Sequence, residues 1–278
     1  MPVACTPSRD PGVTRALIRT RHDPYGVVTY RSARLEAAGF PHAFAARHGG
    51  VSEAPFATLN LGQAIAPGAE DPAERVEENL RRLLAAAGLA GRRLVRVTQV
   101  HGIETLLAER IADGPRREAD ALMASDRGFA VTIRMADCVP VLLACPRTGR
   151  VAAVHAGWRG LVGGMIESAI ATLEAAGSRR EDLEAAIGPC IGVEAYEVGP
   201  EVAATCRAAG LGAAVCERTP RAHLDCFSAA SIAIERAGID SSRIDGAPLC
   251  TFAHPDEFFS YRRDGARSGR LAAVIGPR

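Results

Sequence analysis

The sequence predicts a single α/β domain built on mixed β-sheet. The chain has 278 residues, of which 47% are hydrophobic and 23% charged, and these are the values of a globular protein. Apolar runs of strand length alternate with amphipathic stretches of helical length. No internal repeat, low-complexity run or linker divides the chain. We therefore expect one domain over residues 26–278, preceded by a poorly ordered leader over residues 1–25.

The first half of this domain is expected to contain three strands and one long helix. The strands are short apolar runs next to polar or turn-forming residues, at positions 26–30, 43–46 and 94–98. The helix is expected over residues 70–89, which end near glycines. Its apolar residues recur at helical spacing: Val76, Leu80, Leu83 and Leu84.

The second half begins with the most apolar part of the chain. Three neighbouring strands are expected at residues 129–135, 139–145 and 151–155, and their continuous apolar character indicates a sheet covered on both faces. Helices are then expected over three further stretches, residues 161–176, 200–209 and 226–237. The remaining predicted strands are residues 183–187, 248–252 and 271–275.

The composition excludes several classes of function. All 33 basic residues are arginine, so no lysine is available for Schiff-base chemistry or for a phosphate-binding P-loop. Any anion must be bound by arginine side chains or backbone amides. The net charge is only +1, which argues against a dedicated nucleic-acid surface. We therefore expect a small-molecule substrate and no nucleic-acid partner; the charge balance does not predict the oligomeric state.

The chain is also expected to be a reduced, cytoplasmic protein without a membrane segment. The N-terminus lacks the apolar region of a signal peptide, and no apolar run approaches 18 residues. The eight cysteines lack the dense spacing of a secreted disulfide scaffold, and none form a C-x-x-C pair.

Three residues stand out as candidates for chemistry because they lie where apolar runs end. His101 precedes Gly102, Cys138 lies between two predicted strands, and His155 enters a glycine turn. Two imidazoles and one thiolate make a zinc site with three protein ligands and an open fourth position. By placement alone, two alternatives remain: a metal-free Cys–His nucleophile pair with His155 as the base, and ordinary packed residues.

The chain resembles the YfiH-type laccase-domain family. The resemblance lies in the motifs RHGGVS (47–52), LNLG (59–62), QVHG (99–102), ADC (136–138), HAGWRG (155–160) and GPCIG (188–192). It extends through YEV (196–198) and FFSYRRDG (258–265), and it covers residues 27–276 in order. Members are called laccase-domain proteins, polyphenol oxidases, purine nucleoside phosphorylases or peptidoglycan editing factors.

The resemblance implies a fold, a metal site and an activity. The fold would be a mixed-sheet α/β domain related to the catalytic domain of cytotoxic necrotizing factor, with His101, Cys138 and His155 binding one zinc ion. The implied activities are phosphorolysis of adenosine, inosine, guanosine and methylthioadenosine, together with adenosine deamination. Two stretches depart from the family pattern, around 225–231 and 265–270, and they put the pocket wall in doubt.

This chemistry suggests roles for further residues. Asp137 is expected to transfer protons, or alternatively to orient a ligand histidine. Arg47, beside two glycines, is the expected phosphate-binding fork, with Arg159 as a second phosphate contact before a predicted helix. Ser52 and Asn60 are candidate contacts to ribose or phosphate oxygens, with turn-forming hydrogen bonds as the alternative.

The sequence leaves three other functions to compare with this one. A zinc amidohydrolase that edits a peptidoglycan precursor could use the same metal-activated water. A multicopper oxidase is disfavoured, because the chain has 7 histidines and no His-x-His pair. A non-catalytic zinc protein would need a fourth ligand, for which Cys145 or His48 would be candidates.

Overall fold

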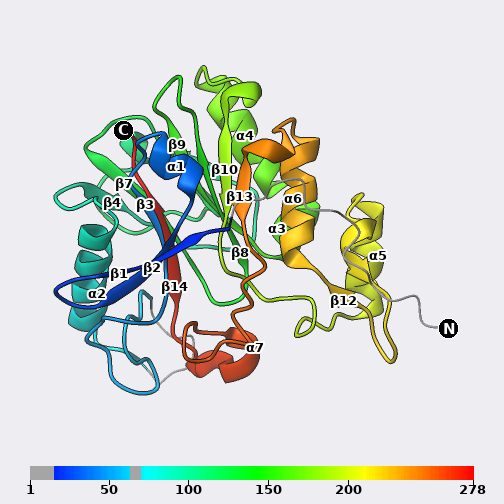
Figure 1. Cartoon of the computed structure of the whole chain (residues 1–278). Helices are drawn as coiled ribbons and strands as arrows, with labels where there is room; N and C mark the ends of the chain where they lie inside the picture. The colour runs from blue at the N-terminus through cyan, green and yellow to red at the C-terminus, as the bar shows by residue number, and fades with distance from the viewer. Residues whose placement is uncertain (1–15, 63–69) are drawn as a thin grey trace.

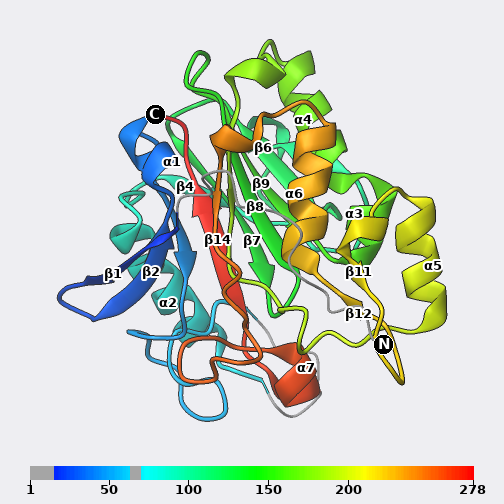
Figure 2. The ribbon, with the colours of Figure 1, turned by 45° about the vertical axis from the view of Figure 1, so that its right-hand side comes forward.

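The computed structural model describes residues 16–62 and 70–278, and it consists of two mixed sheets between helices (Figures 1 and 2). The strand order is β1-β2-β3-β14-β7-β4 in the first sheet and β13-β10-β8-β9-β6-β5 in the second. Most neighbouring strands are antiparallel, but the pairs β4–β7, β5–β6 and β10–β13 are parallel. The predicted mixed-sheet α/β class is therefore confirmed.

The elements have the following bounds. The first sheet contains β1 (Ile18–His22), β2 (Val27–Arg31), β3 (His42–Ala45), β4 (Arg93–Val95), β7 (Phe129–Met135) and β14 (Leu271–Ile275). The second contains β5 (Thr105–Leu107), β6 (Ala121–Ala124), β8 (Val139–Ala144), β9 (Val151–Ala156), β10 (Glu184–Ile187) and β13 (Ile244–Gly246). A separate hairpin pairs β11 (Val215–Cys216) with β12 (His223–Leu224). The α-helices are α1 (Ala33–Ala37), α2 (Ala73–Ala86), α3 (Trp158–Gly163), α4 (Met165–Ala175), α5 (Pro200–Ala208), α6 (Cys226–Arg236) and α7 (Tyr261–Asp264).

The hydrophobic core lies in three layers. One layer separates the two sheets and contains Phe44, Ile133 and Leu142. A second lies between the second sheet and the helices α4 and α6, and a third between the first sheet and α2. Figure 2 shows α2 on one side of the sheets and α4 and α6 on the other.

The alternation of side chains explains the continuous apolar runs. On β8, Val141 and Leu143 face the helices, whereas Leu142 and Ala144 face the other sheet. Both faces are covered, so no position of the strand needs a polar side chain. The strands predicted at 129–135, 139–145 and 151–155 are confirmed for this reason.

Two predicted elements differ from the structure. The helix predicted over 161–176 is divided into α3 and α4 by Gly164, which has a φ of +84° that an α-helix does not accommodate. The strand predicted over 248–252 is wrong: this segment forms only a single bridge between Cys250 and Cys190, and the strand lies earlier, at β13.

The N-terminal boundary also differs. Strand β1 lies inside the predicted leader of residues 1–25, and Ile18–His22 pair with all of β2. The part of the leader over residues 1–15 lies outside the described residues. Within the described chain, no helix is long and apolar enough to span a membrane. Six of the cysteines in the described residues are free thiols: Cys138, Cys145, Cys190, Cys206, Cys226 and Cys250.

A buried histidine makes the stability of this fold depend on pH. His42 is 1% exposed; its Nε2 accepts a hydrogen bond from the Ser32 amide at 2.9 Å, and its Nδ1 donates to the Phe40 carbonyl at 2.8 Å. Burial lowers the pKa of His42 to about 4, from an ordinary value of 6.5. The folded chain therefore holds this ring neutral where the unfolded chain protonates it.

We expect the free energy of unfolding to fall as the pH drops from about 6.5 to about 4, because only the unfolded state takes up this proton. At pH 5, His42 should account for a loss of about 2 kcal/mol relative to pH 7. Urea denaturation of the wild type and His42→Gln at both pH values measures it. The loss should be smaller by this amount in the variant and unchanged in the exposed control His254→Gln. Equal losses in all three proteins would contradict the prediction.

Candidate metal centre and its pocket

The candidate site lies where the chain crosses from one sheet to the other. Strand β7 of the first sheet ends at Met135, and β8 of the second begins at Val139, so the connection is only three residues long. Cys138 is the last of these three. Residue Pro140, next along β8, pairs with His155 on β9, which places the thiol beside that imidazole.

The third member of the group comes from a loop that is organised by one buried carboxylate. Asp120 is completely buried, immediately before β6. Its carboxylate accepts hydrogen bonds from the amides of Val100, His101 and Gly102, at 3.1, 3.0 and 2.7 Å. It also accepts a hydrogen bond from Nδ1 of His155 at 2.8 Å. One aspartate therefore fixes the His101 loop and the His155 ring together.

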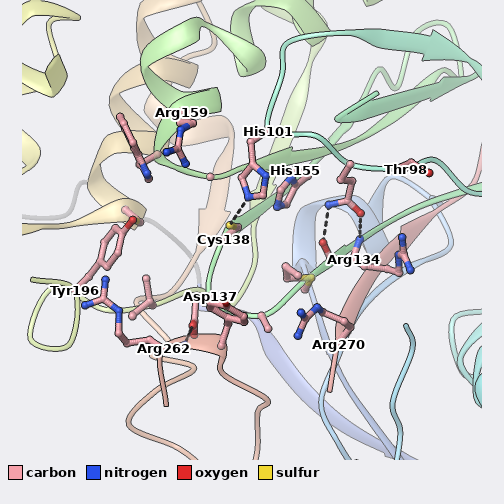
Figure 3. Close-up of a pocket in the computed structure, with 18 residues that line it drawn as sticks. Thr98, His101, Arg134, Asp137, Cys138, His155, Arg159, Tyr196, Arg262 and Arg270 are labelled. Carbon is pink, nitrogen blue, oxygen red and sulfur yellow. Dashed lines mark hydrogen bonds between the residues drawn. The ribbon is translucent and has the colours of Figure 1, made fainter. Parts of the chain in front are cut away.

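His101, Cys138 and His155 converge on one another, as Figure 3 shows. Their ligand atoms all lie within 4.8 Å of one another, and Sγ of Cys138 lies 3.8 Å from Nε2 of His101. Because Asp120 binds Nδ1 of His155, Nε2 of that ring is the nitrogen left for a ligand. His101 has a left-handed backbone with a φ of 59°, a strained conformation that the three Asp120 hydrogen bonds stabilise.

The electrostatics favour a thiolate paired with an imidazolium in the metal-free site. Burial opposes the ionised form of Cys138, but the charge of His155 and hydrogen bonds from both histidines outweigh it and lower the pKa of the thiol. Burial likewise disfavours protonated His155, but the Cys138 thiolate and Asp120 outweigh it and raise the pKa of this ring. The thiolate is the form of cysteine that ligates metals.

Gly157 leaves room for this group. A Cβ atom at this position would lie 2.8 Å from Cδ2 of His101 and 3.1 Å from Sγ of Cys138. The backbone of Gly157, with a φ of −71°, is one that other residues also adopt. The glycine is thus required by the close approach of His101 and Cys138.

The group lies in a pocket of about 600 Å³ with a markedly basic lining. The charged residues outside the His–Cys group are four arginines and one aspartate: Arg134, Arg159, Arg262, Arg270 and Asp137. Aromatic rings of Trp158, Tyr196 and Tyr261 also line it. Such a lining suits a substrate with both a flat ring and an anionic group.

Asp137 lies in the pocket wall, in a left-handed conformation with a φ of 95°. Its carboxylate accepts hydrogen bonds of 2.6 Å from the Thr251 hydroxyl and from the Arg262 amide. At His155 the orienting carboxylate is that of Asp120 and not that of Asp137.

Of the predicted anion and substrate contacts, the structure brings only Arg159 into the pocket. Arg47 donates hydrogen bonds to the carbonyls of Ala57 and Pro255 and packs over the ring of Phe259, 4.4 Å from its centroid. Its guanidinium therefore joins loops rather than binding a ligand. The structure does not place Arg47 in the pocket lining, and backbone carbonyls occupy its Nε and Nη1 donors, so phosphate binding by Arg47 stays a prediction.

Ser52 and Asn60 are likewise bound to the protein itself. Both donate to the carboxylate of Asp71, at 2.5 and 2.9 Å, and Asn79 donates to the Ser52 hydroxyl at 2.8 Å. Ser52 is 4% exposed and Asn60 fully buried, so neither reaches a substrate. The alternative of structural hydrogen bonds is the one that the structure supports. Asn60 nevertheless affects the pocket, since its Oδ1 accepts a hydrogen bond from the amide of Arg270 at 2.8 Å.

Four residues of the site are not predicted from the sequence: Asp120, Arg134, Arg262 and Arg270. Asp120 directly precedes an apolar strand, and Arg134 is the one charge inside the run 129–135. A charged residue in such a position signals a buried partner or a ligand. The two stretches that depart from the family pattern contribute Cys226 and Arg270 to the lining.

The donor set fits a metal ion with an open position. Among the described residues, His101, Cys138 and His155 form the single group of three or more His, Cys, Asp or Glu side chains that could hold one. The proposed fourth ligands lie elsewhere: Cys145 is buried in the core, and His48 contacts Glu257 at 3.1 Å. A closed structural site with one of these two residues is thereby disfavoured.

Comparisons with known proteins place the chain in a family. A model of the family described as multi-copper polyphenol oxidoreductase laccase matches residues 41–278. A Deinococcus radiodurans protein named purine nucleoside phosphorylase is 44% identical over 236 residues, covering 85% of this chain and 88% of the relative. One from Xylella fastidiosa with the same name is 39% identical over 232 residues, covering 81% and 87%.

Solved structures share the fold. YlmD from Geobacillus stearothermophilus superposes with a TM-score of 0.82 at 28% sequence identity, covering 94% of this chain and 99% of that one. The YfiH protein of Bacillus licheniformis superposes with a TM-score of 0.80 at 26% identity, covering 92% and 98%.

We expect Asp120→Asn to lower the affinity for Zn²⁺ by about 10- to 100-fold, because the amide cannot orient and polarise His155 as the carboxylate does. Competition with a chromophoric chelator measures the affinity, and the exposed Asp113→Asn is the matched control. An unchanged affinity in Asp120→Asn would refute the role given to this carboxylate.

We also expect Gly157→Ala to lower the Zn²⁺ affinity by about 10-fold or more, because the new methyl group displaces His101 or Cys138. Gly160→Ala in the adjoining helix is the control, since its Cβ would meet nothing closer than 3.4 Å. The same chelator competition and a thermal melt separate loss of the site from loss of the fold. Equal affinities in the two variants would show that the close approach at Gly157 is unimportant.

Proposed function

Because this chain belongs to the multi-copper polyphenol oxidoreductase laccase family, whose relatives include purine nucleoside phosphorylases, we propose that it is such a phosphorylase. Its substrates would be adenosine, inosine, guanosine and methylthioadenosine, with adenosine deamination as a second activity. The observation that carries the proposal is the pocket itself, in which a metal-ligand group, aromatic rings and four arginines surround one cavity of about 600 Å³.

Phosphorolysis consists of three changes in bonding. A phosphate oxygen forms a bond to C1′ of the sugar, the bond from C1′ to the purine nitrogen breaks, and the purine takes up the electron pair and a proton. The arginines of the pocket can bind the phosphate, and Trp158 and Tyr196 can pack against the base. Fixed positions for both substrates convert a bimolecular reaction into one within the complex.

Asp137 is the proposed proton-transferring group. It is the acid of the pocket lining, and it is 8% exposed. Each of its oxygens accepts one hydrogen bond, which leaves lone pairs to receive a proton or direct it to the leaving purine. The Thr251 and Arg262 hydrogen bonds fix the carboxylate in place, as proton transfer to a bound substrate requires.

We propose zinc as the metal, with His101, Cys138 and His155 as its ligands. Two imidazoles and a thiolate are a ligand set that zinc commonly uses in catalytic sites. When bound, the ion supplies a Lewis acid that polarises a substrate atom or acidifies water, which is what deamination requires. The family's printed name refers to several coppers, but the described residues offer one group of three ligands.

Hydrolysis of an amide in a peptidoglycan precursor is the second candidate. The four arginines of the lining favour it, because such precursors carry several anionic groups. The same ligand group would serve this reaction, and only the substrate would differ. The aromatic residues beside the metal ligands favour the purine instead.

Product analysis distinguishes these functions. Zinc-loaded protein with adenosine and phosphate should release adenine and ribose 1-phosphate, and without phosphate it should release inosine. Cys138→Ala, which removes a ligand, should lower both rates by at least about 100-fold. If neither product exceeds that of the variant, nucleoside chemistry is refuted and amide hydrolysis becomes the first candidate.

A further inference from the structure

Arginines from separate segments gather at one end of the pocket. Arg134 lies on β7 and Arg270 directly precedes β14, and both line the main cavity. Arg134 also lines a small adjoining cavity together with Arg96, Arg116 and Glu77. The guanidinium of Arg134 is thus shared between the substrate pocket and a cluster of basic side chains behind it. We call Arg96, Arg116, Arg134 and Arg270 the arginine cluster.

In the part of the chain that the structure describes, one member of the arginine cluster forms an ion pair. Arg96 forms an ion pair with Glu77 at 2.5 Å. Within the described residues, no carboxylate forms an ion pair with Arg116, Arg134 or Arg270. The charges of Glu77 and Asp137 act on Arg116 and Arg270 without forming ion pairs with them. Within the described residues the arginine cluster therefore keeps an excess of positive charge that an anion could offset.

Burial and the neighbouring arginines make the charged form of Arg134 less favourable. Burial, together with the charges of Arg116, Arg96 and Arg270, lowers the pKa of Arg134 to about 10. Burial likewise lowers the pKa of Arg270. Cations held close together at a partly buried site are unfavourable unless a bound anion compensates them.

Both arginines of the pocket are held by their backbones. The Arg134 guanidinium has no hydrogen-bond partner within the described residues, whereas Nη1 of Arg270 donates to the carbonyls of Ser268 and Gly269 at 2.8 and 3.1 Å, so Nε and Nη2 are the Arg270 donors left for a ligand. The Gln99 side chain accepts a hydrogen bond from the amide of Arg134 and donates one to its carbonyl, at 2.8 and 2.7 Å. Asn60 accepts from the amide of Arg270 at 2.8 Å. Gly62 lies against both side chains, since a Cβ there would be 3.1 Å from carbons of each. Asn60 is in this way a positioning residue, although it does not touch the pocket.

The other two arginines of the pocket, Arg262 and Arg159, pack over aromatic rings. Arg262 packs over Tyr196, 4.9 Å from its centroid, and donates to the carbonyl of Glu197. Arg159 packs over Trp158, 4.6 Å from its centroid. Figure 3 shows Arg159, Tyr196 and Arg262 on one side of the His–Cys group and Arg134 and Arg270 on the other. We call the side with Trp158 and Tyr196 the aromatic side; on the side with Arg134 and Arg270, the Arg270 guanidinium lies 5.7 Å from the centroid of the Tyr261 ring.

We propose that Arg134 and Arg270, with Arg116 behind them, bind the inorganic phosphate that attacks the nucleoside. The aromatic side, with Trp158 and Tyr196, is then left for the purine, and the sugar lies between the two, beside Cys138. The assignment rests on the proposed function, because it identifies the anion as the co-substrate of phosphorolysis. Two guanidinium forks suit the paired oxygens of a phosphate dianion.

Direct binding of inorganic phosphate tests the site without turnover. Isothermal titration should show one phosphate per wild-type chain, and Arg134→Gln and Arg270→Gln should each weaken its binding by about 10-fold or more. The matched control is Arg179→Gln, an exposed arginine in the loop before β10, which should bind phosphate as the wild type does. Arg134→Lys and Arg270→Lys keep the charge without the fork and should bind with intermediate affinity, and thermal melts confirm that each variant is folded.

Steady-state kinetics supply a second readout. In both glutamine variants the KM for phosphate should rise by about 10-fold or more while the KM for nucleoside is unchanged. The exposed control Arg179→Gln should leave both KM values unchanged.

The outcomes separate this site from the proposed function. If phosphorolysis occurs but the glutamine variants bind phosphate like the wild type, the site assignment is overturned and the function stands. If the variants lose phosphate binding although the wild type cleaves no nucleoside, the anion site is supported and the phosphorylase is refuted. If folded wild-type protein binds no phosphate, the assignment fails whatever the activity.

Discussion

The candidate site depends on one buried carboxylate. Asp120 accepts hydrogen bonds from three successive amides of the His101 loop and from the ring of His155. It stands before β6, which pairs with β9, so the same short stretch also fixes the strand that carries His155. Its burial costs little because four donors surround it, and its hydrogen bonds hold the His101 loop in a strained conformation.

Local sequence was sufficient to single out the candidate metal ligands but not the residues that support them. His101, Cys138 and His155 stand at strand ends beside glycines or breaks, and this placement is visible in a single segment. Asp120 and Arg134 act on residues brought near by the pairing of strands, which no segment reveals alone. The central strands were predictable because both their faces are covered, whereas β1 and β5 are short and more exposed and give no such signal.

The positions of Arg47, Ser52 and Asn60 outside the pocket lining have a common physical cause. Loops that bind phosphate and loops that bind their own backbone use the same residue types: glycines, small polar side chains and an arginine. In this chain the segment folds back on itself and is closed by Asp71 and Asn79, which satisfy its polar groups internally. A buried polar network needs no ligand once each of its members has a partner.

Because the connection between the sheets has only three residues, a metal ion bound at the candidate site would also link the two sheets. Cys138 is the last residue of the connection that leaves the first sheet, and His155 belongs to the second sheet. His101 lies in the chain between β4 of the first sheet and β5 of the second. An ion bound by all three would crosslink the two sheets and would oppose movement of one sheet relative to the other. Since ligation requires the folded arrangement, the free energy of ion binding would add to the stability of the whole fold.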